Sequence, residues 1–424
     1  MNLSDSEIVR SILLSNGMTN VLSLDKADVI LLNTCSIRDN AEDRIFKRID
    51  FIHHFLKKNK KKAIIGILGC MSERLKDKLF AFSNAVSLVV GPDEYRKMPE
   101  IIKTAMEGGN EIAVDLSLVE TYGDIIPSRD SNLLAWVSIM RGCNNFCSYC
   151  VVPYTRGRER SRSYISILEE INRLKIKNYK EVTLLGQNVN SYNDAGKRFP
   201  ELLSDIASIA PDMRIRFVTS HPRDMSDDLI EVIAKYDNIC KYIHLPIQSG
   251  SNRILKDMNR HYTVEHFMNL IDKIRSAIPN CAISTDVIAG YPIETLEDHK
   301  CTLSIMKEVR FDSAYMFKYS SREGTKSAKM YDEVSEEEKI RRLNEIIEQQ
   351  NKISREKNNE DIGKEFEILV ETPSKKNKLE WTGRTDTNKV VIFDNKILKH
   401  KAGDIIKLKI NRATSATLFG SIIN

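Results

Sequence analysis

The chain lacks any apolar run long enough to cross a membrane. Its longest one, residues 63–71, is far short of the roughly 20 residues that a membrane-spanning helix needs. An N-terminal basic segment followed by an apolar stretch is also missing, which argues against a secretory signal peptide. We therefore expect a soluble protein of the reducing cytoplasm, in which the eight cysteines serve as ligands or buried thiols and not as disulfides.

A large net charge is missing as well, but the small excess is unevenly placed. The formal charge of the whole chain is +5, and residues 362–424 carry all of it, with 12 Lys/Arg against 7 Asp/Glu. A basic segment beside a neutral body is typical of a protein with a phosphate-rich partner, although solvated surface charge gives the same pattern.

A fourth metal ligand is missing beside the most informative motif, which is formed by Cys143, Cys147 and Cys150. The three thiols lie in C-N-N-F-C-S-Y-C, directly after a strand-like run. Structural zinc takes four ligands, and no other Cys or His lies within about a dozen residues on either side. Three thiolates can instead hold three corners of a cuboidal iron–sulfur cluster and leave one iron open to a reactant. Zinc and inert buried cysteines are the weaker alternatives.

Helix-like and strand-like segments alternate through most of the 424 residues, which predicts an α/β protein. Near the N-terminus, residues 5–16 have the pattern of an amphipathic helix, and the apolar runs 28–33 and 63–68 are typical of buried parallel strands. Cys35 and Cys70 follow these two strands directly, at the sheet edge where α/β proteins bind ligands. They are candidate ligands of a second metal site, and ordinary buried thiols are the alternative.

Six further strand candidates alternate with helices after residues 108–132, which have the composition of a linker. Six such units predict an open, partial (β/α)6 barrel, because a complete barrel has eight and needs more chain. The strand candidates are residues 133–140, 181–186, 214–220, 242–248, 282–290 and 313–319.

Polar motifs follow four of these strands, at the rim that carries the active site in parallel α/β barrels. Each motif alone is typical of turn chemistry, and a lone histidine such as His221 is more often structural than catalytic. Together with the three-cysteine motif, they predict one ligand-binding chamber. The rim residues are Gln187, Asn188, Ser220, His221, Gln248, Ser249, Gly290, Tyr291 and Pro292.

The C-terminal part changes in texture. Residues 333–360 have the pattern of one long charged helix, and short β-rich segments broken by Gly, Asn and Asp follow. These segments predict a small antiparallel β-barrel, and basic barrels of this size often bind looped RNA. We therefore expect three domains, in residues 1–115, 129–360 and 361–424.

Several motifs carry a resemblance to a known family. C-x3-C-x2-C on the first strand of a six-unit barrel resembles the radical S-adenosylmethionine (SAM) superfamily. N-T-C-S-I-R (residues 33–38), G-C-M (69–71), the twenty residues 143–162 and L-L-G-Q-N-V-N-S-Y (184–192) are similar to its methylthiotransferases. The resemblance covers essentially the whole chain, including a C-terminal segment similar to a TRAM domain.

This resemblance implies two [4Fe–4S] clusters and SAM as cofactors, with SAM bound by the rim residues. Cys143, Cys147 and Cys150 would hold the radical-generating cluster, and Cys35 and Cys70 would be two of three ligands of an auxiliary cluster that supplies sulfur. The implied reaction converts N6-(dimethylallyl)adenosine at position 37 of tRNA into its 2-methylthio derivative. The implied partners are the tRNA anticodon loop, an electron donor and a sulfur source, and we expect a monomer.

The residues after the three-cysteine motif are candidate RNA contacts. A basic run that is exposed, or paired within the protein, is the alternative. The adenine beside an anticodon lies in a single-stranded loop, where extruding a base costs little. The candidates are Tyr154, Arg156, Arg158, Arg160 and Arg162.

The start of the chain departs from the family. The first family motif resembles G-C-Q-M-N-x-x-D-S-E, whereas this chain opens M-N-L-S-D-S-E, so that Met1 lies two places after the position of the third auxiliary cysteine. We expect a truncated chain or a start assigned at an internal Met, without that cysteine and the first strand. Cys240, Cys281 and Cys301 are expected to be structural thiols.

Three other functions stay open at this point. Related enzymes methylthiolate threonylcarbamoyl-adenosine in tRNA or an aspartate of a ribosomal protein, although the motifs S-I-R and L-L-G-Q-N-V-N favour the tRNA enzyme described above. A truncated RNA-binding protein without full activity is the third alternative.

Overall fold

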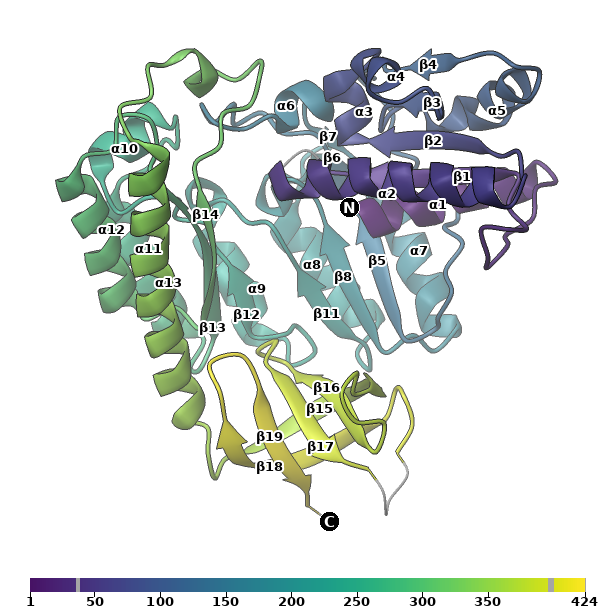
Figure 1. The fold of residues 1–424 in the computed structure, drawn as a ribbon. Helices are drawn as coiled ribbons and strands as arrows, with labels where there is room; N and C mark the ends of the chain where they lie inside the picture. The colour runs from purple at the N-terminus through teal and green to yellow at the C-terminus, as the bar shows by residue number, and fades with distance from the viewer. Residues whose placement is uncertain (36–38, 396–399, 424) are drawn as a thin grey trace. The chain divides into compact units, whose positions relative to one another are not determined.

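The computed structural model describes residues 1–35, 39–395 and 400–423, and its chain forms two compact units (Figure 1). Each unit combines stretches that are far apart in the sequence. The domain boundaries at residues 115, 129 and 361 therefore stay a prediction. The first unit holds Met1–Asp130, Trp136–Ile167 and Ser320–Ala328, and the second holds Ser131–Ala135, Leu168–Tyr319 and Lys329–Asn424.

The first unit contains a parallel sheet with the strands in chain order: β1 (Val29–Thr34), β2 (Ile64–Gly69), β3 (Val86–Val90) and β4 (Glu111–Ala113). All six residues of β2 are buried, as expected for a central strand covered on both faces. Both predicted strands are confirmed, displaced by one residue. The predicted linker is partly structured, because β4 lies within it. The helices of this unit are α1 (Asn2–Ser15), α2 (Asp39–Lys58), α3 (Cys70–Leu75), α4 (Lys78–Phe82), η1 (Tyr95–Lys97), α5 (Met98–Met106) and α6 (Val152–Thr155).

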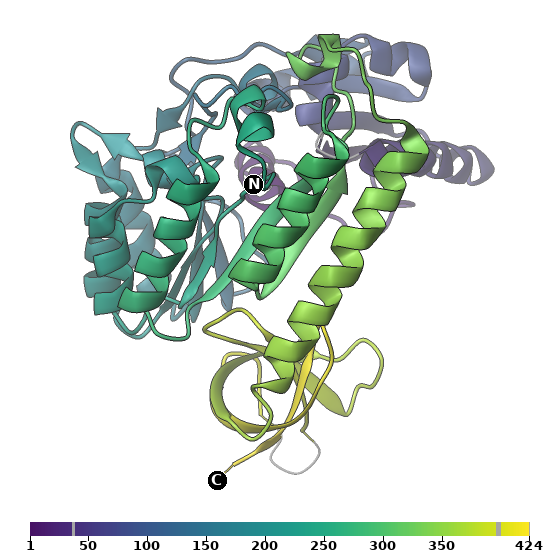
Figure 2. The same ribbon diagram turned by 90° about the vertical axis from the view of Figure 1, so that its left-hand side faces the viewer.

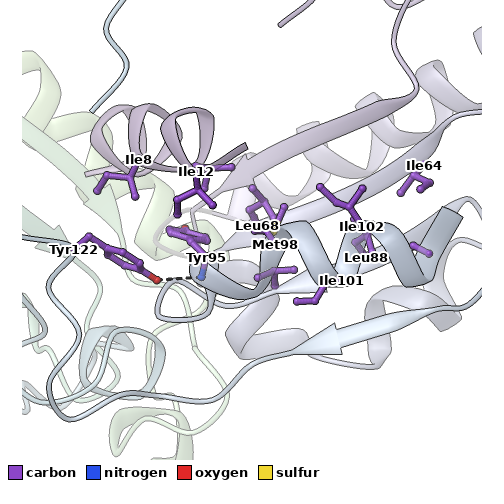
Figure 3. Close-up of a cluster of buried hydrophobic side chains, with 13 residues drawn as sticks. Ile8, Ile12, Ile64, Leu68, Leu88, Tyr95, Met98, Ile101, Ile102 and Tyr122 are labelled. Carbon is purple, nitrogen blue, oxygen red and sulfur yellow. Dashed lines mark hydrogen bonds between the residues drawn. The ribbon is translucent and has the colours of Figure 1, made fainter. Parts of the chain in front are cut away.

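A hydrophobic core joins this sheet to α1 and α5 (Figure 3). Ile8 of α1, Leu68 of β2 and Ile102 of α5 contribute to it. Tyr122 also packs there, although it belongs to the predicted linker, and its hydroxyl accepts a hydrogen bond of 3.0 Å from the backbone amide of Tyr95. The segment after β4 is therefore anchored to the core.

The partial barrel consists of two three-stranded sheets, ordered β11-β8-β5 and β12-β13-β14. Strand β8 pairs in parallel with β11, and β13 pairs in parallel with both β12 and β14. The sheets approach each other where Ile215 of β11 forms a parallel bridge with Ile239, just before β12. All six predicted strands are present and end earlier than expected: β5 (Leu134–Ser138), β8 (Glu181–Leu185), β11 (Arg214–Phe217), β12 (Tyr242–His244), β13 (Ala282–Ala289) and β14 (Ser313–Lys318).

Helices connect the strands of the partial barrel, as a (β/α) succession requires. After the last strand follows α13 (Glu336–Asn359). Its first turn carries three glutamates and is capped by the Ser335 hydroxyl, which accepts a 3.2 Å hydrogen bond from the amide of Glu338. The others are α7 (Tyr164–Ile176), η2 (Val189–Ser191), α8 (Phe199–Ile209), η3 (Pro222–Asp224), α9 (Asp227–Lys235), α10 (Asn252–Asp257), α11 (Val264–Ala277), α12 (Leu296–Val309) and η4 (Ser327–Lys329). Short antiparallel pairs are formed by β6 (Met140–Arg141) with β7 (Arg160–Ser161), and by β9 (Asn193–Asp194) with β10 (Lys197–Arg198).

The C-terminal residues form a closed five-stranded barrel directly after α13, in the order β15-β16-β17-β19-β18 (Figure 2). Its pairings are antiparallel except for β17 with β19, which is parallel, so the purely antiparallel prediction was wrong at this one pair. The α/β class with a small C-terminal barrel is confirmed. The strands are β15 (Glu365–Pro373), β16 (Glu380–Thr385), β17 (Val390–Asp394), β18 (Ile405–Ala413) and β19 (Leu418–Ile422).

Buried arginines tie this barrel to the parallel sheet of the same unit. Arg214 donates a 2.8 Å hydrogen bond to the Arg384 carbonyl, and Arg216 donates one of 2.7 Å to the carbonyl of Thr385. Arg216 is also ion-paired with Glu181 at 2.9 Å. Arg214 and Glu181 open their strands, so the barrel is attached at the end of the sheet opposite to the predicted rim. Within the described ranges, no helix is both long and apolar enough to span a bilayer.

Candidate active site

The three-cysteine motif lies on a loop of the first unit, between β6 and α6. Cys143 and Cys147 are buried and Cys150 is half-buried. The Cys143 amide donates to the carbonyl of Gly157 at 3.2 Å, and the Cys150 amide donates to the carbonyl of Cys147 at 2.9 Å. The first bond holds the loop against the segment after α6, and the second closes a turn within the loop. The predicted position of the motif, directly after the first barrel strand, is confirmed.

A glycine before the motif permits this close approach. Gly142 has φ +76°, and a Cβ atom there would lie 2.0 Å from the carbonyl oxygen of Arg158. A side chain at this position would therefore clash with backbone as well as strain φ. Only glycine lets the cysteine loop and the Gly157–Arg158 backbone touch.

The donor set of this loop fits an iron–sulfur cluster. Among the described residues, no three His, Cys, Asp or Glu side chains converge on one metal ion. A cuboidal cluster requires a different geometry, since each thiolate binds a separate iron. Cys143, Cys147 and Cys150 would hold such a cluster, with one iron left for a small-molecule ligand.

The structure also brings Cys35 and Cys70 to one edge of the N-terminal sheet. Thr34 ends β1, Gly69 ends β2, and the parallel register pairs these two residues with each other. The cysteines that follow them therefore leave adjacent strands at the same level. This common position fits the predicted second metal site, whose identity stays a prediction. The remaining residues of the N-T-C-S-I-R motif, 36–38, lie outside the described residues.

The five candidate RNA contacts fall into two groups. Tyr154 and Arg158 are exposed, with the Arg158 guanidinium 4.3 Å from the centre of the Phe146 ring. The other three are buried, and internal pairing, the alternative kept open above, describes them better. Their partners are Asp5 and Cys70 for Arg156, Asp93 for Arg160, and Ser166 for Arg162.

In the second unit, polar residues after β8 and β11 are joined into one group. The backbone amide of Val189 donates to the Thr219 carbonyl at 3.1 Å. The side-chain nitrogen of Asn188 donates to the Asp224 carboxylate at 2.6 Å. The Asn188 oxygen consequently points elsewhere. It is one of five buried polar atoms in this group without a hydrogen-bond partner among the described residues. They are Gln187 Oε1, Asn188 Oδ1, Asn190 Oδ1, Ser220 Oγ and His221 Nε2.

His221 gives this group an uncharged hydrogen-bond donor. Its Nδ1 accepts a 3.2 Å hydrogen bond from the amide of Arg223, so in the neutral ring the proton lies on Nε2. Burial, aided by nearby cations, first of all Arg260, lowers the pKa of His221 to about 2. Unpartnered buried polar atoms are rare in native folds, and such a mixture of donors and acceptors fits a polar ligand such as SAM.

The other predicted rim residues have structural partners. The backbone amide of Gln248 donates to the backbone carbonyl of Asp286, the Gly290 amide donates to the Glu294 side chain, and the Tyr291 hydroxyl donates to Asp257 at 2.7 Å. Ser249 is fully buried, and the Pro292 carbonyl accepts from Glu333. These contacts shape the strand ends, and ligand binding by these residues stays a prediction.

Sequence reasoning missed three residues that organise the rim. Asn190 and Asp224 belong to the polar group, and Tyr262 packs its ring edge on His221 while donating a 2.8 Å hydrogen bond to the Ile247 carbonyl. Asn190 stands in the motif L-L-G-Q-N-V-N and could have been found there. Nothing local distinguishes Tyr262.

The three cysteines predicted to be structural differ in exposure. Cys240 and Cys281 are buried, and burial raises the pKa of their thiols to about 11 and about 12, so both stay protonated. Cys301 is exposed on α12.

Three family models match the chain. The model described as Radical SAM superfamily matches residues 137–304, Uncharacterized protein family UPF0004 matches residues 1–91, and TRAM domain matches residues 360–423. Together they follow the chain from the N-terminal sheet through the partial barrel to the C-terminal barrel.

Curated relatives are similar over nearly the full chain. The tRNA-2-methylthio-N(6)-dimethylallyladenosine synthase of Phocaeicola vulgatus is 52% identical over 427 residues, which are 99% of this chain and 93% of the relative. The one of Porphyromonas gingivalis is 50% identical and covers 100% of this chain and 93% of its own length. The chain belongs to the MiaB-type radical SAM methylthiotransferases. As a MiaB-type protein it is a radical SAM enzyme, and its family implies SAM and [4Fe–4S] clusters as cofactors.

Solved structures agree with this MiaB-type fold. The radical SAM methyltransferase TsrM from Kitasatospora setae superposes with a TM-score of 0.59 at 14% identity, over 76% of this chain and 73% of TsrM. The cobalamin-dependent SAM radical enzyme OxsB gives a TM-score of 0.54 at 14% identity, over 71% of this chain and 49% of OxsB. At such identities the likeness concerns the fold alone.

Replacing Gly142 by alanine should displace the cysteine loop. The added Cβ clashes with the Arg158 carbonyl, and positive φ costs a further 1 kcal/mol or so. We expect the iron bound after anaerobic reconstitution to fall by more than half. Gly196→Ala is the matched control, because Gly196 also has positive φ but nothing lies within 4 Å of an added Cβ. Equal iron content in both variants would contradict this account of the loop.

Acid should destabilise the fold through His221. Its pKa is about 2 in the fold and about 6.5 in the unfolded chain, so below about pH 6.5 only the unfolded chain gains this proton. Stability is thus fully present above about pH 6.5 and decreases as the pH falls toward 2, by about 1.4 kcal/mol per unit, or about 2 kcal/mol between pH 6.5 and 5. Urea unfolding at several pH values measures this slope. His221→Gln should flatten it, whereas replacing the exposed His266 by glutamine should not.

Proposed function

We propose that this protein is a tRNA-2-methylthio-N6-dimethylallyladenosine synthase. It adds a methylthio group at C2 of N6-(dimethylallyl)adenosine, at position 37 in the tRNA anticodon loop. The observation that carries the proposal is 52% identity over 99% of the chain with a relative of that name. The buried loop with three thiols and the C-terminal barrel at the TRAM position support it.

The reaction itself demands unusual chemistry. The C2–H bond of adenine has no useful acidity, so no side chain acting as a base can open it. When bound, the [4Fe–4S] cluster and SAM supply a 5′-deoxyadenosyl radical, which is the kind of reagent that such a bond requires. The protein then has to hold the cofactors, orient the base and exclude water.

The described residues are suited to these tasks. Cys143, Cys147 and Cys150 would hold the radical-generating cluster on a loop that is largely shielded from water. The unpartnered atoms of Asn188 and His221 would orient SAM, and His221 does so without charge.

The proposed reaction also uses an auxiliary iron–sulfur cluster. Cys35 and Cys70 would supply two of its thiolates, from adjacent strand ends. An electron donor and a sulfur source complete the proposed partners.

Binding of tRNA would use the basic C-terminal barrel and two exposed residues, Tyr154 and Arg158. Residues 362–424 carry the whole net charge of +5, and phosphate contacts of this kind give affinity without sequence selectivity. Tyr154 presents an exposed ring on which an unstacked base can lie. We propose that the protein acts on this substrate in the cytoplasm and as a monomer.

Replacing Cys147 by alanine should abolish turnover. After anaerobic reconstitution, the unmodified protein should release 5′-deoxyadenosine and convert tRNA that contains N6-(dimethylallyl)adenosine, as measured by nucleoside mass spectrometry. Cys147→Ala should do neither, whereas Cys301→Ala, at an exposed cysteine, should keep both. If threonylcarbamoyl-adenosine or a ribosomal-protein aspartate is converted instead, the proposed substrate is wrong. If 5′-deoxyadenosine is released without any methylthiolation, the proposed activity is wrong.

Arg158→Ala should weaken tRNA binding about equally for all tRNAs and lower the slope of log affinity against log salt by about 1. The reason is that Arg158 is exposed, whereas its buried neighbours are already paired. Arg341→Ala, at an exposed arginine that is ion-paired with Glu338 and Glu345 on α13, is the control. Filter binding at several salt concentrations measures the affinity of each variant and its salt dependence. Equal slopes in the two variants would show that Arg158 does not contact RNA.

A further inference from the structure

Arg156 connects the segment after the three-cysteine motif to Cys70. Its Nε donates a hydrogen bond of 3.1 Å to Cys70 Sγ, and its Nη2 is 2.7 Å from a carboxylate oxygen of Asp5. Arg156 is 3% exposed and Cys70 is 7% exposed, so the contact is shielded from water. A guanidinium is planar and rigid, and two bonds from its two sides fix its orientation.

The third nitrogen of this guanidinium is unused. Arg156 Nη1 is buried and has no hydrogen-bond partner within the part of the chain that the structure describes. A buried charged group with an unsatisfied N–H is costly, which points to an acceptor that binds there. The Nη1 hydrogens of a planar guanidinium point about 120° away from the Nε–H bond, so that acceptor would lie on the side remote from Cys70, and Nε alone contacts the Cys70 sulfur.

The surrounding charges favour an anionic sulfur at Cys70. Arg141 donates to Asp5 at 2.9 Å, and Arg160 is paired with Asp93 at 3.0 Å. With Arg156, three buried arginines face two carboxylates in this ion-paired set. Burial by itself would lower the pKa of Arg156, but Asp5 and Cys70 outweigh burial and hold the pKa well above its usual value.

We propose that Arg156 is a positioning residue of the auxiliary centre: through Nε it orients Cys70 and donates a hydrogen bond to the sulfur with which Cys70 holds an anionic iron–sulfur group. The inference rests on the proposed function, which puts such a group at Cys35 and Cys70. A donor beside a cluster stabilises the added electron, so Arg156 raises the reduction potential of that cluster.

The test isolates the auxiliary centre in the full-length chain. Cys143, Cys147 and Cys150 are replaced by alanine, and this parent is reconstituted anaerobically with iron and sulfide. Its cluster is then titrated with a reductant and followed by electron paramagnetic resonance. Arg156→Gln should lower the ratio of reduced to oxidised cluster at a fixed potential by about tenfold, which for one electron is about 59 mV. Arg156→Lys, which keeps the charge but cannot reach both partners, should shift it less.

Arg160→Gln is the matched control, because Arg160 is a buried arginine of the same segment that pairs with Asp93 and not with Cys70. An equal shift in Arg160→Gln and Arg156→Gln, or no shift in either, would overturn the inference and leave the proposed function standing. A parent that binds no iron would overturn both. If Arg156→Gln does not fold, Arg156→Lys decides by the same titration, with circular dichroism as the check on folding.

Discussion

Asp5 of helix α1 joins the two chain segments that flank the cysteine loop. Its carboxylate is fully buried and pairs with Arg141 at 2.9 Å and with Arg156 at 2.7 Å. Burial would raise the pKa of Asp5, but the two guanidinium groups lower it to about 2, so the carboxylate stays ionised. Removing one partner of such a buried pair typically costs about 3–5 kcal/mol, because the remaining charge loses its compensation. The cysteine loop lies between the two arginines, and its position therefore depends on helix α1.

The same ion pairs explain the basic run after the cysteine motif. A run such as Arg156, Arg158, Arg160 and Arg162 looks from its composition like a nucleic-acid contact. In the fold, Arg156, Arg160 and Arg162 are buried, and only Arg158 keeps its charge at the surface. Because each inward arginine has an internal partner, the segment serves mainly to organise the site.

In the second unit, the unpartnered atoms of the polar group carry no charge. Asn188, Ser220 and His221 present buried donors and acceptors, and His221 is neutral at physiological pH. Hydrogen bonds in such an environment are strong and directional. A buried polar atom without a partner costs free energy, and a ligand that bonds to it removes this cost. The C-terminal barrel is attached to the opposite ends of the strands through Arg214 and Arg216, which leaves this rim unobstructed by it.

The sequence by itself determined whatever depends on neighbours along the chain. Apolar runs specified the parallel strands, the spacing of the cysteine motif specified its chemistry, and Cys35 and Cys70 were placed correctly because each directly follows a strand. Only the tertiary structure decided which partner each polar group meets. Asp5 and Arg141 are 136 residues apart, and Arg156 and Cys70 are 86 residues apart. Local composition records that a side chain is charged, but burial and distance set its partner, so the inward arginines and the core position of Tyr122 could not be read from the sequence.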